Sequence, residues 1–166
     1  MYNNHFEIFE LPVSFDINKD TLAQRYRDLQ RAVHPDKYAN APDRDRRLAM
    51  QKTVQINEAF QTLKNPLTRA GYLLHLQGID QNDGIMDGEF LMTQMDLREE
   101  LADIKQKSLP IEAFLSRMEK QMQSLIDTLS QQFAQENWQA AHDSVRQFQF
   151  FTRLHEDALR LEEELI

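Results

Sequence analysis

The sequence of 166 residues contains no cysteine, only four glycines and only five prolines. Without cysteine the chain can form no disulfide bond, zinc–thiolate site, thiol nucleophile or cysteine-ligated metal cluster. Scarce glycine and proline argue against long irregular segments and favour a folded, helix-rich protein. Because the chain has no long apolar run and no signal-like start, we expect a cytoplasmic protein that does not span a membrane.

The net charge of −8 disfavours nucleic acid as a partner, since lysine and arginine supply most of the affinity for phosphates. This charge is distributed unevenly. Residues 1–78 carry 11 basic and 9 acidic residues, whereas residues 79–166 carry 8 and 18. We therefore expect two parts that differ in kind.

Helix signals mark the first part of the chain. Asn18 can cap a helix that ends before Pro35, because proline disfavours the helical conformation of the residue that precedes it. Apolar residues of this helix recur at spacings of three and four: Leu22, Tyr26, Leu29 and Val33. Further helices are predicted from Pro42, over residues 66–77, and over a short stretch before Pro12.

Three of the four glycines fall in the turn-rich stretch "GIDQNDGIMDG", where we place a linker at residues 78–88. Beyond it, helical patterns run over residues 88–107, 110–136 and 137–166. The sequence thus predicts an all-α protein with a helical hairpin domain at residues 1–77 and a three-helix bundle at residues 89–166.

The tripeptide His34-Pro35-Asp36 ends the first long helix. A histidine beside an aspartate suggests an acid–base enzyme, but catalysis of that kind also needs a nucleophile and an oxyanion site. The sequence has no motif for either, nor for a phosphate-binding loop, a dinucleotide turn or a zinc peptidase. The other histidines lack metal-ligand spacing: His5, His75, His142 and His155. We expect no catalysis, no metal and no cofactor.

The same tripeptide stands in a wider pattern. It follows the helix with the apolar stripe and precedes "INEAFQTLKNP" and "TRAGYLL". Together these features resemble the J-domain of the DnaJ co-chaperone family across residues 1–75. The resemblance implies that the helix and the turn dock on an ATP-bound DnaK-class chaperone and stimulate its ATP hydrolysis.

The residues of this turn suit docking. Pro35 fixes the backbone, so that the neighbouring side chains lose little entropy when they bind. Arg27 and Arg31 lie one helical turn apart and opposite the apolar stripe, where they can meet an acidic partner. Arg25 lies nearer the core edge, and Lys37 extends the basic strip. The candidate chaperone-binding residues are Arg25, Arg27, Arg31, His34, Pro35, Asp36 and Lys37.

The stretch "FLMTQMDLREELADIK" is apolar on two faces. On a helix, four of its residues fall within about 40 degrees of one direction and form a core face: Phe90, Leu97, Leu101 and Ile104. The others point elsewhere and alternate with acidic residues: Leu91, Met92 and Met95, with Asp96, Glu99 and Asp103. An exposed apolar patch with an acidic border favours a binding role.

The last predicted helix carries a similar excess of apolar residues. Phe148 and Phe150 project about 160 degrees apart on a helix. They cannot both enter the core together with Phe151, so one of the three phenylalanines is expected to be spare.

Over its whole length the chain resembles the HscB family of J-domain co-chaperones, notably in "FLMTQMDLREEL" and "VRQFQFFTRL". The resemblance implies that the bundle binds the iron–sulfur scaffold protein IscU and delivers it to HscA, a DnaK-class ATPase. This family's scaffold-binding surface matches Leu91, Met92, Met95, Asp96, Glu99, Asp103 and Phe150.

Two other functions stay open at this point. The chain could be a general J-domain co-chaperone for unfolded clients, or an acid–base or metal-dependent enzyme that uses His34 and Asp36. We expect a monomer, because the exposed apolar patch is already assigned to a client.

Overall fold

The computed structural model describes residues 2–82, 84 and 86–165, which form helices and their connecting turns. No strand occurs in this part of the chain, so the all-α prediction is confirmed. Within the described ranges, no helix combines the length and the hydropathy that crossing a membrane requires. Residues 83 and 85 of the predicted linker, and Ile166 of the last predicted helix, lie outside the described residues.

Internal contacts divide the chain into two compact units, one ending at Leu73 and the other beginning at Leu74. The division falls inside helix α4 (Pro66–Leu76) rather than in the predicted linker. The first unit also contains the helices α1 (His5–Ile8), α2 (Lys19–Val33), η1 (Pro35–Tyr38) and α3 (Asp43–Lys64). The second contains α5 (Gly88–Lys107), α6 (Glu112–Ala134) and α7 (Trp138–Glu164).

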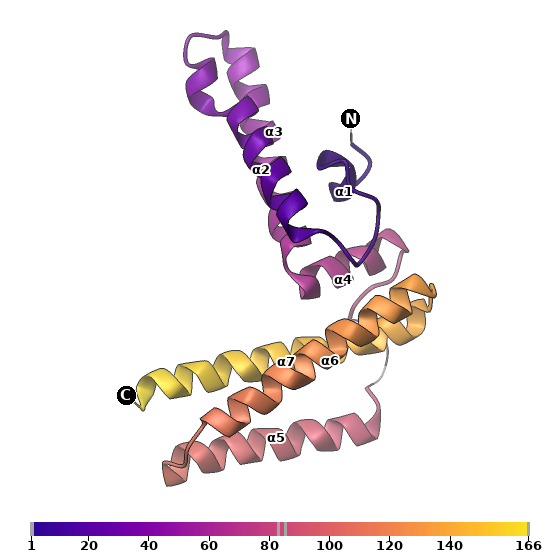
Figure 1. Cartoon of the computed structure of the whole chain (residues 1–166), viewed down its shortest axis with the longest axis vertical. Helices are drawn as coiled ribbons and strands as arrows, with labels where there is room; N and C mark the ends of the chain where they lie inside the picture. Colours follow the sequence, from indigo (N-terminus) through magenta and orange to yellow (C-terminus); the bar gives the residue numbers. More distant parts are fainter. Residues whose placement is uncertain (1, 83, 85, 166) are drawn as a thin grey trace. The chain divides into compact units, whose positions relative to one another are not determined.

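The first unit is built on the antiparallel pair α2 and α3, with α1 beside α3 (Figure 1). As predicted, Asn18 caps α2, since its Oδ1 accepts the Thr21 amide at 3.0 Å. Helix α2 ends at Val33, immediately before the turn, as the proline signal indicates. The predicted start of the next helix is one residue early, because Pro42 is the cap of α3 rather than its first residue.

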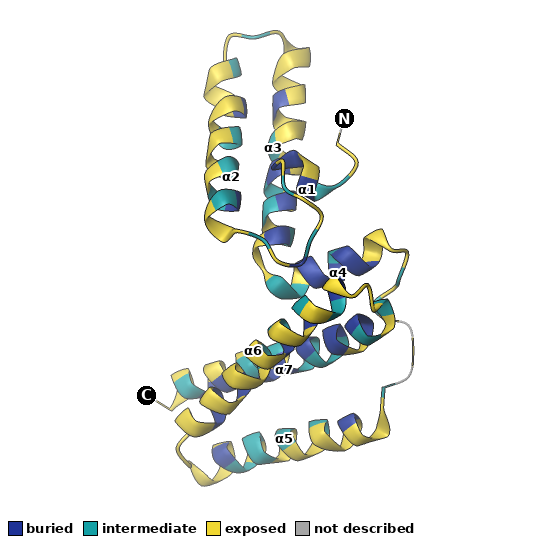
Figure 2. Ribbon diagram, turned by 45° about the vertical axis from the view of Figure 1, so that its right-hand side comes forward, coloured by how far each residue is buried: buried dark blue, intermediate teal, exposed yellow. Residues whose placement is uncertain are grey.

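The core of this unit is formed by the inner faces of α2 and α3 together with α1 and α4, which also carry buried residues (Figure 2). Leu22 and Leu63 are fully buried there, and Tyr26 stacks on Phe60 at 3.9 Å between ring centroids. Arg69 is also buried, and burial lowers its pKa. Its Nη1 donates to the Leu63 carbonyl at 2.7 Å, which satisfies part of the charged group.

The second unit is built on the antiparallel pair α6 and α7, with α5 alongside (Figure 1). Leu129, Val145 and Leu154 are fully buried in it. The bounds of α5 match the prediction, whereas α6 and α7 are each slightly shorter than expected.

Helix α5 contributes less to the core than its apolar pattern predicts. Phe90 and Ile104 are buried, but Leu97 and Leu101 are only half-buried. Most of the helix is exposed or half-buried (Figure 2). The core of the second unit is therefore mainly that of the α6–α7 hairpin.

We expect Asn137→Ala to lower the free energy of unfolding of the second unit by about 1 kcal/mol, because α7 loses its N-cap. In the structure, Asn137 Oδ1 accepts the Ala140 amide at 3.3 Å. The only tryptophan, Trp138, lies at the start of α7, so its fluorescence during urea denaturation reports on this unit. Asn137→Asp keeps the acceptor and serves as the control. An alanine variant as stable as the wild type contradicts the role of the cap.

Candidate functional site

The turn between α2 and α3 presents its polar side chains to water. His34 has an extended ψ of 134° and is followed by the short helix η1, which begins at Pro35. The side chains of His34 and Asp36 are 58% and 93% exposed. His34 Nδ1 accepts the Asp36 amide at 3.2 Å, so the ring is oriented by the turn itself. Pro35 and Lys37 are exposed as well.

This geometry gives no support to an enzyme. A catalytic histidine needs a site that holds a substrate next to it and a third group that orients it. Here Nδ1 is engaged by a backbone amide, and the Asp36 carboxylate lies 3.6 Å away and open to solvent. In the described part of the chain, no group of three or more potential ligands could hold a metal ion.

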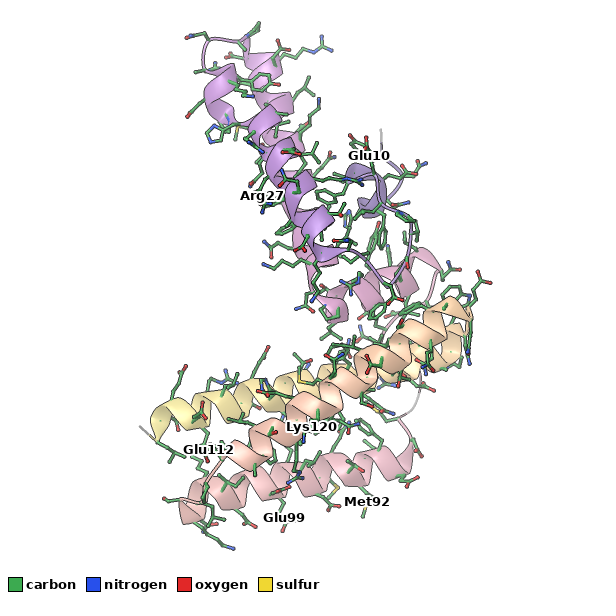
Figure 3. The ribbon with its side chains drawn as sticks, viewed as in Figure 1. Glu10, Arg27, Met92, Glu99, Glu112 and Lys120 are labelled. Atoms are coloured by element: carbon green, nitrogen blue, oxygen red, sulfur yellow. The ribbon has the colours of Figure 1, made fainter. Side chains whose placement is uncertain are left out.

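The exposed face of α2 is basic, but its arginines have partners. Figure 3 shows Arg27 leaving α2 on the side away from α1. Arg27 Nη2 donates to Gln24 Oε1 at 2.9 Å, and Arg31 Nη2 donates to Asp28 Oδ1 at 2.6 Å. Asp28, which is not among the predicted site residues, lies three positions before Arg31 and offsets part of its charge. Because these pairs are exposed, they contribute little to stability. A binding partner can therefore replace Gln24 and Asp28 as the acceptor at a small cost in free energy.

Arg25 is placed differently from the other two arginines. Its Nη1 donates to the carbonyl oxygens of Phe9 and Glu10, both at 2.6 Å. The side chain is half-buried and fastens the turn after α1 to α2. The structure thus gives Arg25 a contact inside the first unit, and its role in chaperone binding stays a prediction.

The predicted patch on α5 is exposed. Leu91, Met92 and Met95 are 44%, 61% and 68% exposed, so three large apolar side chains within five positions of one helix face solvent. Figure 3 shows Met92 and Glu99 on the side of α5 that points away from α6 and α7. Of the acidic residues, Asp96 and Glu99 are exposed, and Asp103 is half-buried.

Phe150 is the spare phenylalanine of α7. It is half-buried, whereas Phe148 and Phe151 are buried. Its ring meets Phe90 edge to face at 5.7 Å between centroids, which joins α7 to the start of α5. The structure therefore places Phe150 next to α5, the helix that carries the other predicted patch residues.

Sequence reasoning missed Arg98, which borders the same region. Its guanidinium carbon lies 5.8 Å from the centroid of Phe150, and its Nη1 donates to Asp157 Oδ2 at 2.5 Å. The pKa of Asp157 is lowered, first because Arg98 donates this hydrogen bond. The signal was available, since Arg98 follows Met95 by three positions and so shares its side of the helix.

Comparison with known proteins agrees with this two-unit arrangement. The family model described as the DnaJ domain matches residues 4–72. The one described as the HSCB C-terminal oligomerisation domain matches residues 86–158. The co-chaperone protein HscB homolog of Photobacterium profundum is 45% identical, over 96% of this chain and 97% of the relative.

This chain belongs to the HscB family of co-chaperones. The structure of the chaperone HscB from Vibrio cholerae is similar to it, with a TM-score of 0.89 and 41% identity over 98% of this chain and 99% of that chain. The crystal structure of human co-chaperone protein HscB gives a TM-score of 0.89 and 27% identity, over 97% of this chain and 82% of that chain. As an HscB-family protein, it is a J-domain co-chaperone.

In this HscB-family protein we expect Arg25→Met to lower the free energy of unfolding of the first unit by about 1.5–3 kcal/mol, because two backbone carbonyls lose a charged donor. Arg27→Met and Arg31→Met should change it by less than about 0.5 kcal/mol, since their partners are exposed side chains. Thermal unfolding followed by circular dichroism measures the difference, with Trp138 fluorescence as the readout of the second unit. Equal effects of the three substitutions would contradict the role of Arg25 in holding the turn after α1 on α2.

Proposed function

We propose that this protein binds the iron–sulfur scaffold protein IscU, delivers it to the DnaK-class chaperone HscA, and stimulates the ATPase activity of HscA. Iron–sulfur cluster assembly and transfer on the scaffold are promoted as a result. The observation that carries the proposal is the exposure of two surfaces, the turn at His34–Asp36 in the first unit and the apolar patch of α5 in the second. Membership of the HscB family supports the pairing of these two sites in one chain.

The chaperone-binding half of the proposal rests on the turn and on the exposed face of α2. The turn presents His34 and Asp36 on a backbone that Pro35 restricts, and Arg27, Arg31 and Lys37 add positive charge. Such a preorganised and charged surface suits a transient partner with an acidic face. Arg25 contributes indirectly, by fixing the turn after α1 to the same helix.

The scaffold-binding half rests on the patch of α5 and on Phe150 of α7. The exposed side chains of Leu91, Met92 and Met95 offer apolar anchors, and the border of Asp96, Glu99 and Asp103 offers negative charge. A few apolar anchors with an acidic rim suit an exchangeable complex, because the client has to be handed over.

We further propose that the protein acts as a monomer in the cytoplasm. The exposed apolar patch is occupied by the client in this scheme, so a second copy is not needed to cover it.

We expect His34→Gln to abolish the stimulation of HscA while leaving IscU binding intact. The substitution removes the oriented imidazole from the turn of the first unit, whereas the proposed IscU surface belongs to the second unit. Single-turnover ATP hydrolysis by HscA, with and without IscU, measures the effect. Wild type should act synergistically with IscU, and the variant should not. Full stimulation by the variant contradicts the role of the turn, and equal stimulation with any unfolded client favours the general co-chaperone instead.

We expect Leu91→Ala combined with Phe150→Ala to weaken IscU binding by about 10- to 100-fold, because two apolar anchors are truncated. Isothermal titration calorimetry measures the affinity, and circular dichroism checks that helicity is preserved.

The matched control for this variant is Leu109→Ala. Leu109 is 43% exposed, close to the 44% of Leu91, but it follows α5 and lies outside the patch. The affinity of the Leu109→Ala variant for IscU should equal that of the wild type. Unchanged affinity in the double variant, or an equal loss in the control, refutes the proposed surface.

A further inference from the structure

Three side chains of α7 hold the loop that precedes α5. They are spaced by four and three positions, so they share one face of the helix. The contacts are His142 Nε2 to the Asp80 carbonyl at 3.1 Å, Arg146 Nη1 to the Gly84 carbonyl at 2.8 Å, and Gln149 Nε2 to Gln81 Oε1 at 3.1 Å. Asp80, Gln81 and Gly84 of this loop are therefore held on α7.

The anchoring is close and specific. His142 is only 4% exposed, and because a carbonyl can only accept, its Nε2 must carry the proton. Gly84 has a φ of +98°, a backbone conformation that residues other than glycine rarely adopt. A Cβ atom there would lie 3.7 Å from His142 Cε1 and 3.9 Å from Arg146 Nη1. The backbone thus runs directly against the two anchoring side chains.

Helix α5 has few other attachments. Among its described residues only Phe90 and Ile104 are buried. Its two ion pairs to the hairpin, Arg98 with Asp157 and Glu100 with Arg117, are at least partly exposed, and such pairs contribute little. The anchored loop is consequently a second constraint on the position of the start of α5, beside the packing of Phe90 against Phe150 and Phe151.

The position of the start of α5 relative to α7 determines how the residues of the proposed client-binding patch are arranged. Leu91, Met92 and Met95 lie in the first two turns of α5, whereas Phe150 lies on α7. A surface shared by two helices binds well only if their relative position is fixed before binding. Arg146 lies four positions before Phe150, so the anchor and the α7 part of the patch are one helical turn apart.

We propose that Arg146, supported by His142 and Gln149, is a positioning residue for client binding. By holding the Gly84 carbonyl it fixes the first turns of α5 against α7 and so preorganises the two-helix patch. This inference rests on the proposed function, since the client is the scaffold protein named there.

The test combines hydrogen–deuterium exchange of the full chain with calorimetric titration of IscU. Arg146→Met removes the donor and keeps the apolar stem. We expect faster exchange of the amides at residues 92–104, unchanged exchange in the middle of α6, and about three- to tenfold weaker IscU binding. Gly84→Ala strains the backbone on the loop side of the same contact, because of the φ of +98°, without a change of charge, and should give the same two effects.

Two controls separate position from charge. Arg153→Met removes one positive charge from an exposed position of the same helix, and should leave α5 exchange unchanged. Arg146→Lys keeps a charged donor and should restore part of the protection.

The outcomes are distinct. Wild-type exchange of α5 in both Arg146→Met and Gly84→Ala overturns the proposal, as does weaker binding without faster exchange, because Arg146 then acts by direct contact or charge. If the wild type itself does not bind IscU, the proposed function fails, while the exchange of α5 still decides whether Arg146 positions this helix.

Discussion

Both units depend on the same constraint, the burial of apolar side chains between two antiparallel helices. In the first unit α2 pairs with α3, and in the second α6 pairs with α7. Leu22, Leu63, Leu129 and Leu154 are fully buried in these two seams. Each seam supplies a rigid support, because tightly packed interiors deform little. The remaining segments are held on these supports by buried apolar side chains, such as Phe6 of α1 and Phe90 of α5, together with polar contacts.

In both units an arginine side chain donates hydrogen bonds to backbone carbonyls of a neighbouring segment. Arg25 binds the carbonyls after α1, Arg69 binds the carbonyl of Leu63, and Arg146 binds that of Gly84. A guanidinium suits this task, since it offers several donors in a fixed plane and does not lose its charge. A rigid pair of helices with an arginine-bound accessory segment is thus common to both units.

Structural features could be predicted from the sequence wherever they depend on neighbouring residues along the chain. Asn18 and Pro35 define the ends of α2 because a cap and a proline act on their own neighbours. The exposure of Leu91, Met92 and Met95 also follows from helical periodicity alone. Tertiary contacts were not accessible in this way. The half-burial of Leu97 and Leu101 and the hydrogen bonds of Arg25 to the turn after α1 depend on which segments meet in space, and no spacing along the chain encodes that.

The turns that end three of the helical segments use residues other than glycine in the left-handed conformation. Glu10, Ser108 and Glu136 have φ values of 54°, 50° and 56°. Each pays a conformational penalty on the order of 1 kcal/mol relative to glycine. Glycine at these three exposed positions should therefore raise the thermal stability of the protein, and none of them is among the residues proposed for docking. Thermotolerant versions of this co-chaperone could be engineered there without altering what it binds.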